Sequence, residues 1–523
     1  MRPFPLEEYK AQFIQFLLQT GALKVFENPD EDRTLKSKRI SPWFVNMGDF
    51  NDGDSSQILS ELYADAIFGS GVEADVLYGI PDKGVGLVAP VAIAMARKGR
   101  NMSWCFSRKD EKKHGEASHL GPEERIKALL VGRIPQTDNA IIQLDDVFTA
   151  GDAKYDAHNF LVGLGRTNLP LLAIGVDRQE VNVRGQNAIR IYEDATRTRV
   201  VSIVNAMEII SYLMDAKRQL PKLKALKQQL QDKRATIDEA VMDASELDKA
   251  IERFSLVESA LSSRAIERLA LYMRVYGTEE ARAALGIAPE QLIIGRDRSV
   301  IPACDVPTLE HFEKLVKSTC DVEGIGGYKI GFELGLRYGL RTVVETARKY
   351  TDKPIIYDHQ KAGTDIPDTG RNFARVMKEA SVDAVIMFPQ AGPETERAWI
   401  YHALDHGLKV IIGGRMTHPA YAVSEGGFIT DEGALEMYRI GARAGINHFV
   451  VPGNKPDVIL QVKEAVEAEG VSPVFYAPGF VAQGGKIGEA ARVAGDRFHG
   501  IVGRGIYQAK DMKQAAIEHT SQL

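Results

Sequence analysis

Eight short apolar runs recur through the last part of this chain, and each run ends in polar or glycine residues. The spacing between consecutive runs leaves room for one helix, so the pattern predicts repeated strand–helix units. Eight such units in roughly 230 residues are what a (β/α)8 barrel requires. The expected strands are Val300–Asp305, Gly327–Gly331, Pro354–Asp358, Ala384–Gln390, Lys409–Gly414, His448–Gly453, Pro473–Gly479 and Phe498–Gly503.

The third expected strand leads into a stretch of alternating charge, Tyr357–Thr369. Asp358, Lys361 and Asp365 fall within it, and ionisable groups held this close together shift one another's pKa values. The active site of a (β/α)8 barrel lies at the carboxyl ends of its strands, where this stretch belongs. A solvated loop with an ion pair gives the same local pattern, so the other strands have to distinguish the two interpretations.

Polar residues also occur at or near the ends of other expected strands. They are Asp305, Lys329 and Thr417. The seventh strand leads into the glycine-rich segment Pro478–Gly485, and the eighth leads into Gly503–Gly505, which contains Arg504. Glycine-rich loops at these two positions form the usual phosphate site of such barrels, with an arginine as a forked donor. The sequence therefore predicts a site for a phosphorylated ligand.

The first part of the chain has a different α/β pattern. Apolar residues recur at helical spacing over Leu6–Leu18. The runs Val76–Gly79, Ile141–Leu144 and Leu171–Val176 are typical of buried parallel strands. Alternation of such runs with helical patterns predicts an α/β layer fold.

Between the two patterns lies a segment that is poor in helix breakers. No glycine occurs between Gly185 and Gly277, and Pro221 is the only proline in that interval. We therefore predict an α/β domain over 1–215, a helical connector over 216–290 and a (β/α)8 barrel over 291–523.

Two adjacent acids follow the second of the predicted N-terminal strands. Asp145 and Asp146 can accept hydrogen bonds from vicinal ribose hydroxyls, and the turn Thr149–Gly151 lets amides at a helix start contact a phosphate. An aspartate that caps a helix is the plainer alternative. Upstream, Arg108–His119 has no large apolar residue and is expected to be an exposed loop. Beside a phosphoribosyl site, such a cationic loop can close over a diphosphate leaving group.

Composition limits the function classes. A formal charge of −6 argues against a protein that coats nucleic acid, while small anionic ligands stay open. Cys105, Cys304 and Cys320 are too few and too scattered for a disulfide framework, which fits a reducing cytoplasm. The N-terminus carries acids where a signal peptide has an apolar core, and no window approaches ~20 apolar residues. We expect a cytoplasmic protein without membrane or nucleic-acid partners.

Residues 1 to about 215 resemble orotate phosphoribosyltransferase. The resemblance rests on the segments Thr34–Phe44, Arg108–Glu116, Leu144–Gly151 and Val176–Glu180. It implies a catalytic lid made of Lys109, Lys112 and His114.

The same resemblance implies that Asp145 and Asp146 bind the ribose and that Arg178 binds the orotate carboxylate. Magnesium is expected to arrive with the diphosphate, without a protein metal site. Asp152 and Val45 depart from the family, since a hydroxyl and a second aromatic often stand there. The full set of implied substrate contacts is Lys36, Phe44, Lys83, Arg108, Asp145, Asp146, Thr149, Ala150, Gly151 and Arg178.

Residues from about 290 to 523 resemble orotidine 5'-phosphate decarboxylase, through Asp305, Lys329, Met416–Pro419, Pro478–Gly485 and Gly503–Arg504. The family's central motif is acid, one residue, lysine, two residues, then acid, isoleucine and threonine. In this chain two residues separate the first acid from the lysine, and three separate the lysine from the second acid. The half Asp365–Thr369 is intact.

This second resemblance implies roles for the barrel residues. Asp358 and Asp365 frame the substrate carboxylate, Lys361 protonates C6 as CO2 leaves, and Lys329 orients the ribose or an acid. Preorganised charges carry the rate, and no cofactor is implied. The implied substrate contacts are Asp305, Ile366, Thr369, Thr417 for the pyrimidine amide, Pro478, Gln483, Gly503, and Arg504 for the phosphate. Asp365 and Thr369 reach a neighbouring subunit's site, so a homodimer or larger homo-oligomer is expected.

The two resemblances name consecutive reactions, in the order of a fused UMP synthase. The expected ligands are orotate, phosphoribosyl diphosphate, orotidine 5'-phosphate and UMP. One alternative is a transferase joined to an inactive barrel or to another sugar-phosphate decarboxylase. Another alternative is a nucleotide-sensing regulator that binds RNA. The acidic net charge of the chain argues against this alternative.

Overall fold

The computed structural model describes residues 6–35, 37–108, 129–148, 151–231, 244–286, 292–359, 364–480 and 484–523. The contacts divide the chain into two compact units. The first comprises Met1–Met273 and Gly277–Leu285, and the second comprises Arg274–Tyr276 and Gly286–Leu523. The narrower connector boundaries, at 215 and 290, stay predictions.

A six-stranded sheet forms the centre of the first unit. Its order is β10 (Arg199–Asn205), β9 (Leu171–Asp177), β8 (Ile141–Phe148), β5 (Val76–Gly79), β6 (Ser103–Ser107) and β7 (Leu130–Gly132). Neighbouring strands are parallel except for the antiparallel pair β6 and β7. The three runs predicted as buried parallel strands are confirmed. One detail was wrong, because β8 continues through Asp145 and Asp146 to Phe148 instead of ending before the two acids.

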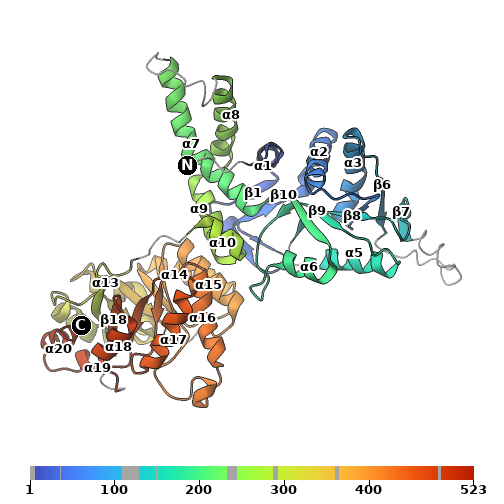
Figure 1. The fold of residues 1–523 in the computed structure, drawn as a ribbon. Helices are drawn as coiled ribbons and strands as arrows, with labels where there is room; N and C mark the ends of the chain where they lie inside the picture. Colours follow the sequence, from blue (N-terminus) through green and yellow to red (C-terminus); the bar gives the residue numbers. More distant parts are fainter. Residues whose placement is uncertain are drawn as a thin grey trace. The chain divides into compact units, whose positions relative to one another are not determined.

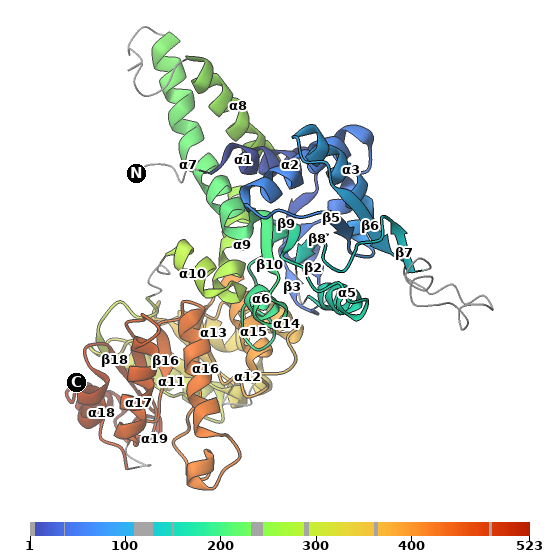
Figure 2. The same cartoon turned by 45° about the vertical axis from the view of Figure 1, so that its right-hand side comes forward.

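Helices cover both faces of this sheet. Figures 1 and 2 show α2 (Gly53–Gly69) and α3 (Lys83–Arg97) on one face, with α5 (Asp152–Gly163) and α6 (Ala188–Thr196) on the other. The helix predicted over Leu6–Leu18 is α1 (Glu8–Gln19). Short strand pairs complete the sheet region of the unit: β1 (Leu23–Val25) with β4 (Trp43–Val45), and β2 (Arg33–Thr34) with β3 (Ile40–Ser41).

The glycine-free segment contains long helices after β10. They are α7 (Ala206–Gln231), α8 (Ala244–Ala260) and α9 (Ser263–Tyr276), and the short helix α10 (Glu279–Leu285) follows Gly277. Figures 1 and 2 show α7 and α8 side by side, and Pro221 lies inside α7. Arg268 of α9 is fully buried and forms two 2.9 Å hydrogen bonds to Asp32, which fixes this helix on the first unit. No described helix is long and apolar enough to cross a membrane.

The second unit is the predicted (β/α)8 barrel, and each of the eight expected runs overlaps one strand. They are β11 (Arg298–Pro302), β12 (Tyr328–Ile330), β13 (Ile355–Asp358), β14 (Ala384–Met387), β15 (Lys409–Gly413), β16 (His448–Val450), β17 (Val474–Ala477) and β18 (Phe498–Val502). All of these strands pair in parallel. The barrel closes between β11 and β12, where the Cys304 N–H donates to the Lys329 carbonyl at 2.7 Å.

Helices lie outside these strands, as Figure 2 shows. They are α11 (Leu309–Thr319), α12 (Phe332–Tyr338), α13 (Leu340–Arg348), α14 (Thr369–Glu379), α15 (Pro393–Asp405), α16 (Asp431–Arg443), α17 (Pro456–Glu467), α18 (Ile487–Ala494), α19 (Arg504–Tyr507) and α20 (Met512–Thr520).

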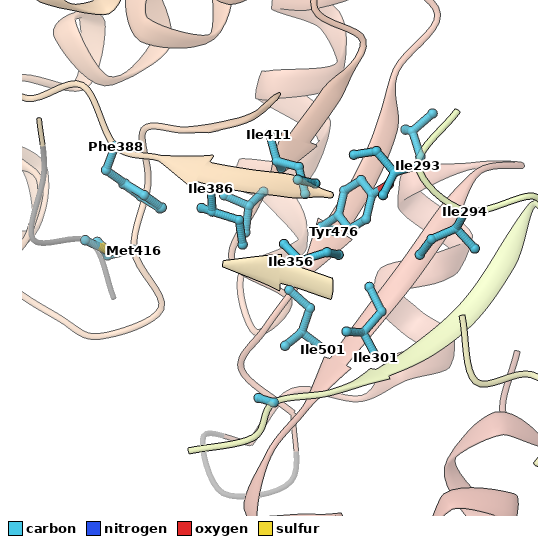
Figure 3. Packing of buried hydrophobic residues seen from close by; sticks show 14 of the residues in the cluster. Ile293, Ile294, Ile301, Ile356, Ile386, Phe388, Ile411, Met416, Tyr476 and Ile501 are labelled. Atoms are coloured by element: carbon cyan, nitrogen blue, oxygen red, sulfur yellow. The ribbon is translucent and has the colours of Figure 1, made fainter. Parts of the chain in front are cut away.

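The barrel interior is filled by branched and aromatic side chains, because parallel strands of a barrel alternate between interior and helix-facing residues. Figure 3 shows Ile356, Ile386 and Ile411 pointing into this core. Phe388 lies at the carboxyl end of the strands, and Ile293 lies at the opposite end. The packed centre leaves polar chemistry to the two ends of the barrel.

Candidate active sites

The register of three barrel strands brings Lys329 between two acids. Lys329 pairs with Ile356 on β13 and forms a bridge with Ala303 after β11, so these three residues share one interior layer. Side chains alternate along a strand, which places Asp305 and Asp358 one layer further toward the carboxyl end on the same face. The strand pairing therefore assembles this cluster from residues that are far apart in the sequence.

The Lys329 ammonium lies 3.1 Å from an Asp358 oxygen and 3.5 Å from an Asp305 oxygen. Lys329 and Asp358 are buried, whereas the Asp305 side chain is one-third exposed, at 33%. Burial lowers the pKa of Lys329, but attraction by Asp358 and then Asp305 outweighs it and raises that pKa above its ordinary value. The site therefore holds a fixed cation between carboxylates, in a place that water hardly reaches.

Arg504 belongs to the same end of the barrel. It is exposed at the first position of α19, directly after Gly503. Burial raises the pKa of Tyr507, and the charges of Asp305, Arg504 and Lys329 all act on that pKa, so these groups lie near the Tyr507 ring. Tyr507 was missed from the sequence, because a tyrosine one turn into a helix carries no motif of its own.

Two other predicted barrel contacts are half-buried at this end. Thr417 follows β15, and its carbonyl accepts a 3.0 Å hydrogen bond from Asn454. Pro478 follows β17. Gln483 lies outside the described residues.

The acidic loop after β13 is only partly described. Asp365 and Ile366 are exposed, and Thr369 begins α14. Trp399 of α15 donates its indole N–H to the Ile366 carbonyl at 3.1 Å, which anchors this half of the loop. Lys361 lies outside the described residues, so its pairing with Asp358 stays a prediction.

In the first unit, Asp145 and Asp146 differ in their surroundings. Asp145 is buried, and both of its carboxylate oxygens have partners: the Asp146 N–H at 2.9 Å and the Lys154 ammonium at 2.5 Å. Asp146 is half-buried, and one of its oxygens accepts the Val147 N–H at 2.7 Å. Asp146 is therefore the more accessible of the two carboxylates.

Arg178 is held rigidly at the end of β9. Its guanidinium lies 2.6 Å from Glu180, donates to the Ser41 hydroxyl at 3.1 Å and stacks over Trp43 at 4.0 Å. A cavity of about 120 Å³ borders Arg178, Arg39 and Phe148. The structure thus brings the β2–β4 region and the end of β9 together.

Other predicted residues of this unit are described less fully. Phe44 is 37% exposed beside Trp43, and Lys83 is the first residue of α3. Arg108 is exposed directly after β6, and Gly151 precedes α5 with a positive φ of 89° that favours glycine. The predicted residues outside the described ranges are Lys36, Lys109, Lys112, His114, Thr149 and Ala150.

The N-terminal part is 36% identical over 223 residues to an orotate phosphoribosyltransferase of Pectobacterium carotovorum, a match that covers 42% of this chain and 96% of that relative. The chain belongs to the orotate phosphoribosyltransferase family. Residues 298–518 match the family model described as Orotidine 5'-phosphate decarboxylase / HUMPS family. The predicted fusion of the two families is confirmed, with the phosphoribosyltransferase part first.

Two solved structures are similar to parts of the chain. One is an orotidine 5'-monophosphate decarboxylase from Methanocaldococcus jannaschii, with 25% identity, a TM-score of 0.39, and coverage of 44% of this chain and 99% of that one. The other is an orotate phosphoribosyltransferase from Francisella tularensis, with 26% identity, a TM-score of 0.33, and coverage of 47% and 98%.

Lys154 of the phosphoribosyltransferase unit was missed from the sequence. It lies on the first turn of α5, is 6% exposed, and also donates to the Val147 carbonyl at 2.8 Å. Burial raises the pKa of Asp145, Lys154 acts against that rise, and Asp146 adds to it. Its sequence neighbourhood also contains Asp152 and Asp156, so nothing in the sequence singles out this lysine.

Replacing Lys154 with methionine is expected to destabilise the phosphoribosyltransferase unit by about 3–5 kcal/mol, since it leaves a buried carboxylate without its partner. The KM for phosphoribosyl diphosphate should rise about tenfold, equivalent to ~1.4 kcal/mol. Thermal unfolding and steady-state kinetics measure both effects. Lys98→Met, which removes a more exposed ion pair with Asp65, is the control and should cost about 1 kcal/mol or less. Equal stability of the two variants would contradict the assignment.

The stability of the first unit is expected to depend on pH through Asp177, which precedes Arg178. Burial raises its pKa from 3.8 to about 6, and Glu180 adds to the rise. An acid whose folded pKa lies above its unfolded pKa makes the folded state less stable as the pH rises through that window. Between pH 4 and 6, the free energy of unfolding of the wild type should fall by up to about 2–3 kcal/mol relative to that of Asp177→Asn. Unfolding temperatures of the two proteins measured across this range test the prediction, and parallel curves would refute it.

Proposed function

We propose that this chain catalyses the last two steps of UMP synthesis. Orotate and phosphoribosyl diphosphate give orotidine 5'-phosphate and diphosphate in the first unit, and the barrel then releases CO2 to give UMP. The first part of the chain matches an orotate phosphoribosyltransferase, and the second matches an orotidine 5'-phosphate decarboxylase family. The product of the first reaction is the substrate of the second. The observation that carries the proposal furthest is the buried Asp305–Lys329–Asp358 cluster at the carboxyl end of the barrel.

In the transferase step, the accessible carboxylate of Asp146 accepts a hydrogen bond from a ribose hydroxyl. Lys154 and the Asp146 N–H hold the neighbouring Asp145 carboxylate in place. Arg178 faces the orotate carboxylate, since its guanidinium is already held in place by Glu180 and Ser41. As the C1'–diphosphate bond breaks, the diphosphate leaves with both bonding electrons. Orotate N1 forms the new bond to C1' and gives up its proton to the departing diphosphate. Lys109, Lys112 and His114 stabilise that leaving charge.

In the decarboxylation step, the substrate carboxylate lies against Asp358, which repels it before the reaction and not after CO2 has left. The C6–carboxylate bond breaks, and its electron pair stays on C6. A proton from the Lys361 ammonium then forms the new C6–H bond. Lys329 keeps its charge throughout, so it fixes Asp358 and stabilises the developing carbanion electrostatically. Arg504 holds the 5'-phosphate.

Magnesium enters the proposal only with the diphosphate. The described residues contain no group of three His, Cys, Asp or Glu side chains that could hold a metal ion, and both Asp145 oxygens are occupied. These residues do not fit a resident magnesium site. We therefore route no step through a protein-bound ion, and diphosphate oxygens supply its ligands.

The proposal includes a homodimer and a cytoplasmic location. Ile366 is 57% exposed beside Asp365, which fits a loop that reaches toward another subunit's site. Cys105, Cys304 and Cys320 are free thiols, which fits a reducing compartment.

Supplying each substrate separately tests the two activities. With orotate and phosphoribosyl diphosphate, the protein should consume orotate and release diphosphate. With orotidine 5'-phosphate alone, it should form UMP. Orotate consumption without any UMP from orotidine 5'-phosphate would favour the inactive-barrel alternative, and RNA binding without either turnover would favour the regulator.

A further inference from the structure

A second polar layer lies inside the barrel at the amino-terminal end of its strands, opposite Lys329. Ser299, His448, Tyr476 and His499 form it, and all four are 2% exposed or less. The register places Ser299 beside His499 and Tyr476 beside His499 on adjacent strands. Tyr476 is packed with Ile293 and Ile294 at this end of the core, as Figure 3 shows. The proposed catalytic function uses none of these residues.

Hydroxyl groups orient both imidazoles. Ser299 Oγ lies 2.7 Å from His499 Nδ1, and Tyr476 Oη lies 3.1 Å from His448 Nδ1. Burial, then His448 and Arg296, lower the pKa of His499 to about 3, so its ring is neutral near pH 7. We assign the hydroxyl hydrogens to the two Nδ1 atoms, which leaves each ring hydrogen on Nε2. The layer then presents ring N–H donors.

Both histidines line a cavity of about 180 Å³ at this end of the barrel. Arg296 and Arg497 also line it, and Asp297 is the one acid in its lining, 3.8 Å from Arg497. Arg296 is exposed and Arg497 is about one-third exposed. Two arginines and two histidines thus line one space with a single acid, and an anion bound there relieves the repulsion between the cations.

We propose that this cavity binds a small anion of the phosphate class. A volume of 180 Å³ corresponds to about six water molecules at ~30 Å³ each, which accommodates inorganic phosphate. Guanidinium forks match phosphate oxygens in pairs, and the two imidazoles supply further donors from the buried wall. The lining carries two arginines and one acid, so its charge favours an anion over a cation.

Equilibrium dialysis of the full chain with radiolabelled inorganic phosphate tests this proposal. The background variant is Arg504→Gln, which silences the proposed catalytic phosphate site. Adding Arg296→Gln and Arg497→Gln should remove one bound phosphate per chain or weaken its binding at least tenfold. Arg492→Gln, an exposed arginine on neighbouring α18, is the matched control and should leave binding unchanged.

A further variant and an unfolding measurement distinguish loss of phosphate binding from loss of folding. His499→Gln keeps a side-chain N–H donor but changes its position, and it should also weaken phosphate binding. Thermal unfolding in phosphate, compared with chloride at equal ionic strength, should show a stabilisation that the arginine variants lose. The proposal would be overturned if the folded Arg296→Gln, Arg497→Gln variant bound phosphate with the same stoichiometry and affinity as the background variant. This outcome does not depend on whether the chain makes UMP.

Discussion

Replacing Lys329 with methionine is expected to slow conversion of orotidine 5'-phosphate to UMP by about 10³-fold or more, while orotate consumption stays unchanged. Lys329 is the described cation that lies within 3.5 Å of both Asp358 and Asp305. Without it, the two carboxylates and the substrate carboxylate repel one another with no positive charge between them. Substrate then binds poorly, and the carbanion loses its nearest described counter-charge.

Loss of Lys329 also removes the ammonium that lies 3.1 Å from the buried Asp358 carboxylate, which destabilises the barrel. Adding Asp358→Asn removes that charge, so the double variant should recover stability without recovering decarboxylation. Lys513→Met, at an exposed position of α20, is the control and should keep wild-type activity. Measuring UMP formation and the unfolding temperature separates the two effects, and near-normal UMP formation by Lys329→Met would refute the assignment.

The second large effect is expected from two lysines that the motifs place in different reactions. Lys361→Ala should let orotate disappear while orotidine 5'-phosphate accumulates, because C6 loses its proton donor. Lys109→Ala should slow orotate consumption about 10²-fold or more, because the lid loses a charge that stabilises the leaving diphosphate. Chromatography of orotate, orotidine 5'-phosphate and UMP over time measures both.

The two variants control for each other, since each should leave the other unit's reaction intact when its substrate is supplied directly. If Lys361→Ala forms UMP at the wild-type rate, the expanded spacing between Asp358 and Asp365 does not hold the proton donor. Lys329, as the nearest described ammonium to Asp358, would then become the candidate for that role.

The barrel was predictable because its strands are buried on both faces. Such strands appear as short apolar runs that end where the chain reaches solvent. Seven of the eight runs contain the observed strand, and the first overlaps β11, which begins at Arg298 instead of Val300. The helical character of the segment after β10 was also predictable, because Pro221, which lies inside α7, is the only proline between Gly185 and Gly277. Tertiary packing keeps that helix continuous despite the lost hydrogen bond.

The contacts within the sites were not predictable in the same way. Order along the chain gave Asp305, Lys329 and Asp358, but their contact depends on the strand register that pairs Lys329 with Ile356. Lys154 lies outside any motif, and only the close packing of α5 against β8 shows that it neutralises Asp145. The extension of β8 through Asp145 and Asp146 was missed because acids are rare inside parallel strands.

The central claim is that one chain performs both reactions, and carboxyl-labelled orotate tests it most directly. The purified wild-type protein is incubated with this orotate, phosphoribosyl diphosphate and magnesium, and released CO2, diphosphate and UMP are counted together. The proposed function predicts one labelled CO2 and one UMP for each diphosphate at completion. Diphosphate release with the label retained in orotidine 5'-phosphate would contradict it.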